Sequence, residues 1–211
     1  MKDFPVFTTE YGVASLILKE VPYRQEAYII LQATEQPEEL LKECVSFCRM
    51  VGAEKILVRG HEYAEQFPLH TVIFEMCGEA LAAEEDPPCL FPVTEQTVSR
   101  WRAIYNERMR QVDNGATLEA KEEKKILESG GAYFVHREGE LLGIGWLEDS
   151  KLLAVASVKP GVGAQVLRTL MSLIPGERMT LEVASTNERA IHLYEKLGFI
   201  RTKEISRWYR V

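Results

Sequence analysis

The sequence has no long apolar segment. Charged residues interrupt each hydrophobic run before it reaches the about 20 residues that a membrane-spanning helix needs. The first residues, Met1-Lys2-Asp3-Phe4-Pro5, also lack the basic and apolar regions of a secretion signal. We therefore expect a cytoplasmic protein that does not enter a membrane.

Cysteine and histidine are scarce, with 4 of each in 211 residues. The cysteines lack the close pairs and accompanying histidines of a zinc site. Two of them are one helical turn apart, and no Cys/His cluster accompanies them. We expect no metal and four reduced, mostly buried thiols, at Cys44, Cys48, Cys77 and Cys89.

A strongly basic segment is missing too. Residues 1–86 carry 7 Lys and Arg against 16 Asp and Glu, a net charge of −9, whereas residues 87–211 carry 18 against 16, a net charge of +2. Binding to nucleic acid needs a basic surface, so we do not expect it. The acidic part suits a cationic amine substrate or only solubility. The near-neutral part is the better candidate to hold an anionic cofactor.

Strand-like and helix-like patterns alternate along the chain, which indicates an α/β fold with a mixed sheet. In the first part the order is β-β-α-β-α-β, with strands at 12–21, 26–33, 55–59 and 69–76 and helices opening at Gln36 and His61. Residues 82–88 combine acidic residues with a proline pair and are the best linker candidate. We therefore expect two domains, 1–86 and 87–211.

The second part reads β-α-α-β-β-β-α-β-α-β. A helix is expected from Thr94 through Met109, and a polar helix at 118–127. Residues 137–140 form a hairpin turn between strands 132–136 and 141–147. A strand at 152–158, a helix at 162–174 and a strand at 179–184 follow. The last strand, 200–211, is expected either whole or as a hairpin between Ile205 and Trp208.

The most specific pattern lies in the last 31 residues. Asn187 suits a helix N-cap, and Gly198 suits a left-handed C-cap. Between them, apolar residues recur at steps of three and four, which places them on one helix face: Ala190, Leu193, Tyr194 and Leu197. From the residues alone, this predicts a strand, a capped amphipathic helix and a following strand.

The ungapped string Asn-x-x-Ala-x-x-Leu-Tyr-x-Lys-x-Gly-Phe, at 187–199, resembles the C-terminal signature of the GCN5-related N-acetyltransferases. That family moves acetyl from acetyl-CoA to an amine. The resemblance implies this acyltransferase fold over 87–211, with acetyl-CoA as co-substrate and an amine of a small molecule or peptide as acceptor. The lobe 1–86 is then either a degenerate half-copy of the fold, since 27–59 parallels 152–183, or an unrelated α/β lobe. It could cover the site, mediate a homodimer or only stabilise the fold.

Glycines at a strand-to-helix turn are the candidate phosphate site. The resemblance implies that backbone N–H groups of Gly161, Val162, Gly163 and Ala164 hold the cofactor's pyrophosphate at a helix N-terminus. The family's Arg or Gln falls on Val158, and its basic loop is missing. Lys159 is the cation left at this turn.

The resemblance assigns further roles to residues near the turn. Backbone groups at the end of the strand, Ala156 and Val158, would bond the pantetheine arm, and Asn187 would contact the cofactor. Tyr194 would be the general acid that protonates the leaving thiolate, since a phenol is protonated at neutral pH. The alternatives are a tyrosine packed on the sheet and an asparagine that only caps its helix.

The general base is not identified by the sequence. Candidates are His136, Glu148, Asp149, Glu182 and His192, of which Glu182 lies within a strand and would be partly buried. Three hypotheses stay open. The first is an acetyl-CoA-dependent N-acetyltransferase, the second is an inactive relative that acts as a binding module, and the third is a generic α/β interaction protein.

Overall fold

A computed structural model describes residues 5–79, 87–174 and 176–211. The chain forms two compact units, Met1–Val72 with Ile205–Val211 and Ile73–Glu204. The two units divide between Val72 and Ile73, whereas the sequence predicted a domain boundary between residues 86 and 87. Residues 82–86 of the predicted linker lie outside the described residues.

The first unit is a sheet in the order β1-β2-β3-β4, followed by the end of β11. Its helix α2 begins at Pro37, with two acidic residues in the first turn, and buries Leu40, Leu41, Cys44 and Cys48. The elements are β1 (Val6–Thr9), β2 (Gly12–Ile17), α1 (Val21–Arg24), β3 (Glu26–Ala33), α2 (Pro37–Met50), β4 (Lys55–Arg59) and the 3₁₀ helix η1 (Glu62–Gln66).

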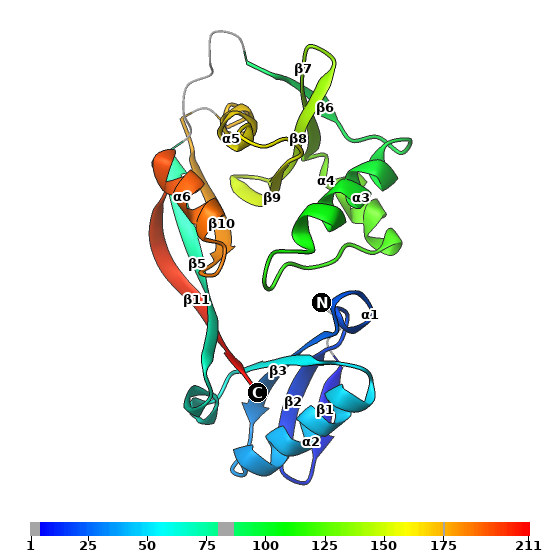
Figure 1. Cartoon of the computed structure of the whole chain (residues 1–211), viewed down its shortest axis with the longest axis vertical. Helices are drawn as coiled ribbons and strands as arrows, with labels where there is room; N and C mark the ends of the chain where they lie inside the picture. Colours follow the sequence, from blue (N-terminus) through cyan, green and yellow to red (C-terminus); the bar gives the residue numbers. More distant parts are fainter. Residues whose placement is uncertain (1–4, 80–86, 175) are drawn as a thin grey trace. The chain divides into compact units, whose positions relative to one another are not determined.

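The second unit has a sheet in the order β11-β5-β10-β9-β8-β7-β6 (Figure 1). Its strands are β5 (Leu69–Glu79), β6 (Cys89–Pro92), β7 (Ala132–Arg137), β8 (Glu140–Glu148), β9 (Lys151–Ser157), β10 (Arg178–Ala184) and β11 (Ile200–Arg210). Its helices are α3 (Val98–Met109), η2 (Ala120–Glu122), α4 (Glu123–Ser129), α5 (Gly163–Met171) and α6 (Glu188–Lys196). Both β5 and β11 pass from one unit into the other.

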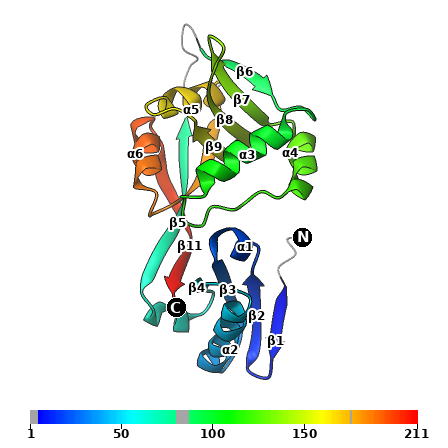
Figure 2. The ribbon, with the colours of Figure 1, turned by 45° about the vertical axis from the view of Figure 1, so that its right-hand side comes forward.

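Two apolar cores form in the second unit. One joins α5 and α6 to β5 and to strands β7 to β10, and the other joins α3 and α4 to β7, β8 and β9. Figure 2 shows where these helices and strands lie in the ribbon. Helix α5 lies close on β8 because two strand positions are glycine. A Cβ added at Gly145 would come within 2.2 Å of the Leu170 side chain, and one at Gly143 within 2.8 Å of Val166.

Each unit contains a parallel β-α-β element, β3-α2-β4 in the first and β9-α5-β10 in the second. In each, an antiparallel strand lies beside the second parallel strand. The end of β11 pairs with β4, and β5 pairs with β10 from Ile73 to Glu79. This shared arrangement fits the predicted half-copy, although an unrelated α/β lobe could adopt it as well.

Several predicted elements differ in detail. The first strand, β1, was not predicted, and residues 21–24 form a short helix between the strands predicted at 12–21 and 26–33. Helix 118–127 is divided into η2 and α4. The alternative of a hairpin between Ile205 and Trp208 is wrong, because β11 runs unbroken and its end pairs with β4. The hairpin turn at 137–140 is confirmed, with positive φ at Glu138 (52°) and Gly139 (79°).

Candidate functional site

A β-bulge in β9 lies where the pairing of β9 with β10 ends. The register of β8 and β9 shifts between Trp146 and Leu147, so that Leu153 is an extra residue on β9. The recorded pairing of β9 with β10 covers Lys151 with Thr180 and Leu152 with Leu181. Along the described part of these strands, no pair follows the bulge. The edge of β9 that faces β10 is therefore unpaired from Leu153 onward.

The direction of the backbone groups changes one prediction. The Val158 N–H donates to the Leu142 carbonyl at 2.8 Å, so Val158 faces β8. Bonded pairs recur at every second residue of an antiparallel ladder, and Ala156 opposite Ile144 therefore faces β8 as well. The backbone groups of Val155 and Ser157 face the unpaired edge instead. The opening is therefore lined by the backbone groups of Val155 and Ser157, not by those predicted at Ala156 and Val158.

The glycine turn begins helix α5 beside this edge. Gly161 has φ of +83° and open space around it, a conformation that favours glycine. Gly163 lies against α6 and β9, because a Cβ added there would be 3.2 Å from Leu193 Cδ2 and 3.9 Å from Ser157 Oγ. The N-cap is Val162, whose side chain accepts no hydrogen bond. The N–H groups of the first turn, including that of Ala164, therefore lack a side-chain cap, and an anion fits there.

Two cations lie near this turn, and the predicted one, Lys159, is already paired. Lys159 forms an ion pair with Glu140, and its hydrogen bond lowers the pKa of the Glu140 carboxyl. A second cation, which the sequence did not suggest, comes from α3. Arg108 Nη2 donates to the Val158 carbonyl at 3.0 Å. Arg108 is exposed and lies at the C-terminal end of β9.

Tyr194 lies on α6 in the same core as α5. The residue is 8% exposed, and its ring centroid is 5.9 Å from that of Phe199. Burial raises the pKa of the hydroxyl to about 12, because desolvation disfavours the phenolate. Within the described residues no hydrogen bond to this hydroxyl is recorded. Tyr194 can therefore be both a packed tyrosine and an available proton donor.

Asn187 caps α6 as its position predicts. Its Oδ1 accepts a hydrogen bond from the Ala190 N–H at 3.3 Å. The side chain is half-buried, and the Nδ2 group is not needed for the cap. Capping accounts for the oxygen, while the amide nitrogen stays available to a ligand.

The candidate bases lie in different surroundings, and the structure selects none of them. Glu182 is exposed and binds Lys151 Nζ at 2.6 Å, so the predicted partial burial is wrong. Its direction explains this, since alternate residues of β10 face opposite sides. Glu148 ends β8 and Asp149 lies in the turn that follows, both of them exposed. His192 is exposed on α6, while His136 packs its ring against Phe91 and Phe134.

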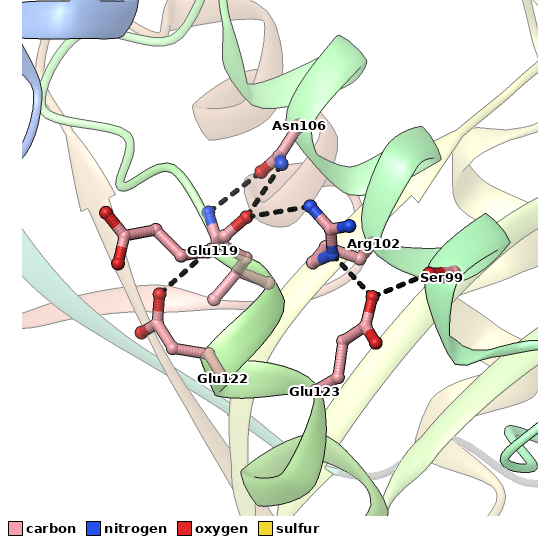
Figure 3. A network of polar contacts seen from close by, with 7 residues as sticks. Ser99, Arg102, Asn106, Glu119, Glu122 and Glu123 are labelled. Atoms are coloured by element: carbon pink, nitrogen blue, oxygen red, sulfur yellow. Dashed lines mark hydrogen bonds and ion pairs between the residues drawn. The ribbon is translucent and has the colours of Figure 1, made fainter.

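A polar network fixes α3 against η2 and α4 (Figure 3). The Asn106 side chain accepts from the Leu118 N–H at 2.8 Å and donates to its carbonyl at 2.9 Å. Arg102 Nε donates to Glu123 at 2.7 Å, and this hydrogen bond lowers the pKa of the Glu123 carboxyl. The network holds the helix from which Arg108 extends.

Other features do not belong to this site. A cavity of about 320 Å³ in the first unit is lined by none of the predicted site residues; Arg59, His61, Glu62 and Tyr209 are among its lining. Among the described residues, no group of histidine, cysteine and carboxylate side chains could hold a metal ion. None of the described helices has the length and apolar character required to cross a membrane.

Comparison with known proteins finds a family match over the part of the chain that contains this site. A family model described as the acetyltransferase (GNAT) family matches residues 80–199. No curated protein matches the chain.

Three solved structures show the fold. A conserved protein of unknown function from Staphylococcus epidermidis is 10% identical with a TM-score of 0.57, and the match covers 100% of this chain and 94% of that one. An acetyltransferase of the GNAT family from Colwellia psychrerythraea is 14% identical with a TM-score of 0.52, covering 94% and 81%. A conserved protein of unknown function from Enterococcus faecalis is 9% identical with a TM-score of 0.62, covering 94% and 58%.

Proposed function

Because the chain belongs to the GNAT acetyltransferase family, we propose that it is an N-acetyltransferase that uses acetyl-CoA. The observation that carries the proposal is the unpaired edge of β9 after the bulge at Leu153, with an uncapped helix N-terminus beside it. The thioester of acetyl-CoA would supply the activated acetyl group. The chain's own residues would hold the cofactor, exclude water and move protons.

Backbone groups would provide most of the cofactor contacts. The N–H groups of the first turn of α5 fit a diphosphate, because no side chain caps them and glycine keeps the approach open. Val155 and Ser157 would extend hydrogen bonding along the pantetheine arm. Such contacts would orient the thioester carbonyl at the bulge. Holding the carbonyl there would supply most of the rate increase that comes from positioning the reactants.

The proposed reaction is direct attack by the acceptor amine. A nitrogen–carbon bond forms as the carbon–sulfur bond breaks, the amine loses a proton, and the departing sulfur gains one. Tyr194 is the proposed donor of the second proton, because its hydroxyl is protonated and has no recorded partner within the described residues. The group that accepts the first proton is not assigned.

The acceptor is proposed to be an amine of a small molecule or peptide. Turnover tests the proposal directly: acetyl-CoA is incubated with a panel of primary amines, and released thiol and acetylated product are measured. The proposal predicts release of one thiol for each acetylated amine. Slow thiol release that no amine accelerates, with no product, would contradict it.

A second candidate is an inactive relative that serves as a binding module. The observation in its favour is that Lys159, the cation of the turn, is engaged by Glu140. This alternative predicts binding without turnover, or no binding. An available tyrosine hydroxyl on α6 favours the enzyme, since a module has no need for a proton donor there.

A further inference from the structure

One cation at the C-terminal end of β9 comes from a distant part of the sequence. Arg108 stands 50 residues before Val158, yet its Nη2 donates to the Val158 carbonyl at 3.0 Å. A guanidinium carries five N–H donors, and this contact uses one of them. In the described part of the chain, no carboxylate is recorded within ion-pair distance of Arg108. Within that part of the chain, the guanidinium therefore has N–H donors that no carboxylate engages.

Within residues 158–164, all of which the structure describes, Lys159 is the single cation. Lys159 is bound by Glu140, and Val162 offers no polar group. Val158 stands three residues before Gly161, so a charge fixed on its carbonyl lies between the end of β9 and the glycine turn. Planar guanidinium groups bind phosphate oxygens through two parallel hydrogen bonds, which makes arginine well suited to a diphosphate.

We propose that Arg108 binds the diphosphate of the cofactor and replaces the basic residue that the glycine turn lacks. This inference rests on the proposed function. It also gives a purpose to the network around Asn106 and Arg102, which fixes α3 (Figure 3). A fixed helix places the Arg108 side chain with a smaller loss of entropy on binding.

A matched pair of variants tests the role. Arg108→Gln removes the charge, and Arg110→Gln removes the same charge two residues further along, from the exposed C-cap of α3. The dissociation constants of acetyl-CoA and of S-acetylpantetheine, which lacks the diphosphate, are measured by calorimetry. Arg108→Lys retains the charge without the paired geometry and should bind with intermediate affinity.

We expect Arg108→Gln to weaken acetyl-CoA about 10- to 100-fold, the usual effect of losing a charged hydrogen bond. In the same variant, the dissociation constant of S-acetylpantetheine should change less than about twofold. In Arg110→Gln, the dissociation constants of both ligands should change by no more than about twofold. The affinity of Arg108→Gln for acetyl-CoA should also depend less on salt. Circular dichroism confirms that each variant is folded.

Two results would overturn the inference alone. The first is equal acetyl-CoA affinity in both glutamine variants while the unmodified protein binds well. The second is an equal loss for both ligands, which would mean that Arg108 only holds the end of β9. If the unmodified protein binds no acetyl-CoA, the proposed function itself fails and the inference fails with it.

Discussion

Replacing Tyr194 with phenylalanine removes a single oxygen atom from the proposed active site. The ring would keep its place in the core, including its contact with Phe199 at 5.9 Å. Among the described residues the hydroxyl has no recorded hydrogen bond that would be lost. We therefore expect the free energy of unfolding near neutral pH to change by less than about 1 kcal/mol.

The effect on catalysis should be much larger. With its pKa raised to about 12, the phenol is protonated throughout the range in which the enzyme would be assayed. A positioned general acid contributes about 10²- to 10⁴-fold to the rate, equivalent to about 3 to 5 kcal/mol in the activation barrier. We expect kcat to fall by that factor in Tyr194→Phe. The dissociation constant of acetyl-CoA should change less than about threefold, because the hydroxyl acts on the leaving sulfur.

The assay compares saturating initial rates with calorimetric binding in the same preparations. Tyr23→Phe is the control, since Tyr23 is 51% exposed in the first unit and has no proposed role. An unchanged kcat would remove Tyr194 from the mechanism. A loss of binding as large as the loss of kcat would show that the hydroxyl holds the cofactor instead.

The same pKa gives a test based on stability. An unfolded tyrosine ionises near pH 10, whereas folded Tyr194 ionises at about 12. The folded state thus holds the proton more tightly, and its stability is full below pH 10 and decreases as pH rises toward 12. Between pH 10 and pH 11, the free energy of unfolding should fall by about 1 kcal/mol more in the unmodified protein than in Tyr194→Phe. Equal losses in urea titrations would argue that the hydroxyl is solvated.

Three further predictions concern the turn, the polar network and the thiols. Gly163→Glu should abolish acetyl-CoA binding through steric and charge conflict, whereas Gly163→Ala should fold normally and bind more weakly; retained binding in Gly163→Glu would refute the site. Asn106→Ala should lower the free energy of unfolding by about 1 to 3 kcal/mol, because both backbone groups of Leu118 lose a partner; an unchanged melting temperature would refute this. Burial raises the pKa of the two α2 thiols, to about 12 and about 11, so iodoacetamide at pH 8 should label exposed Cys89 first, as peptide mass mapping would show.

Local signals were sufficient for much of the fold. Helix α6 begins after Asn187 and is followed by Gly198 with φ of +85°, as the cap residues predicted. The turn at Gly139 and the start of α2 at Pro37 were equally predictable. In each case, the residues that determine the structure lie within a few positions of one another, so the rule can be applied to the sequence directly.

Features that depend on distant pairing could not be predicted this way. The bulge at Leu153 is defined only relative to β8, and it reverses which backbone groups face the opening. The resemblance gave the pantetheine contacts to Ala156 and Val158, whereas the register with β8 turns the backbone groups of Val155 and Ser157 toward the opening. The Arg108 contact likewise joins α3 to β9, and nothing near residue 108 in the sequence indicates it. The unbroken course of β11 depends on pairing with β4.

Calorimetric titration of the full chain with acetyl-CoA tests the central claim most directly. The unpaired edge of β9 and the uncapped start of α5 predict one binding site per chain with a dissociation constant in the micromolar range. Binding should be lost in Gly163→Glu, whose circular dichroism should match that of the unmodified protein. Absence of binding by the unmodified protein at millimolar acetyl-CoA would contradict the account.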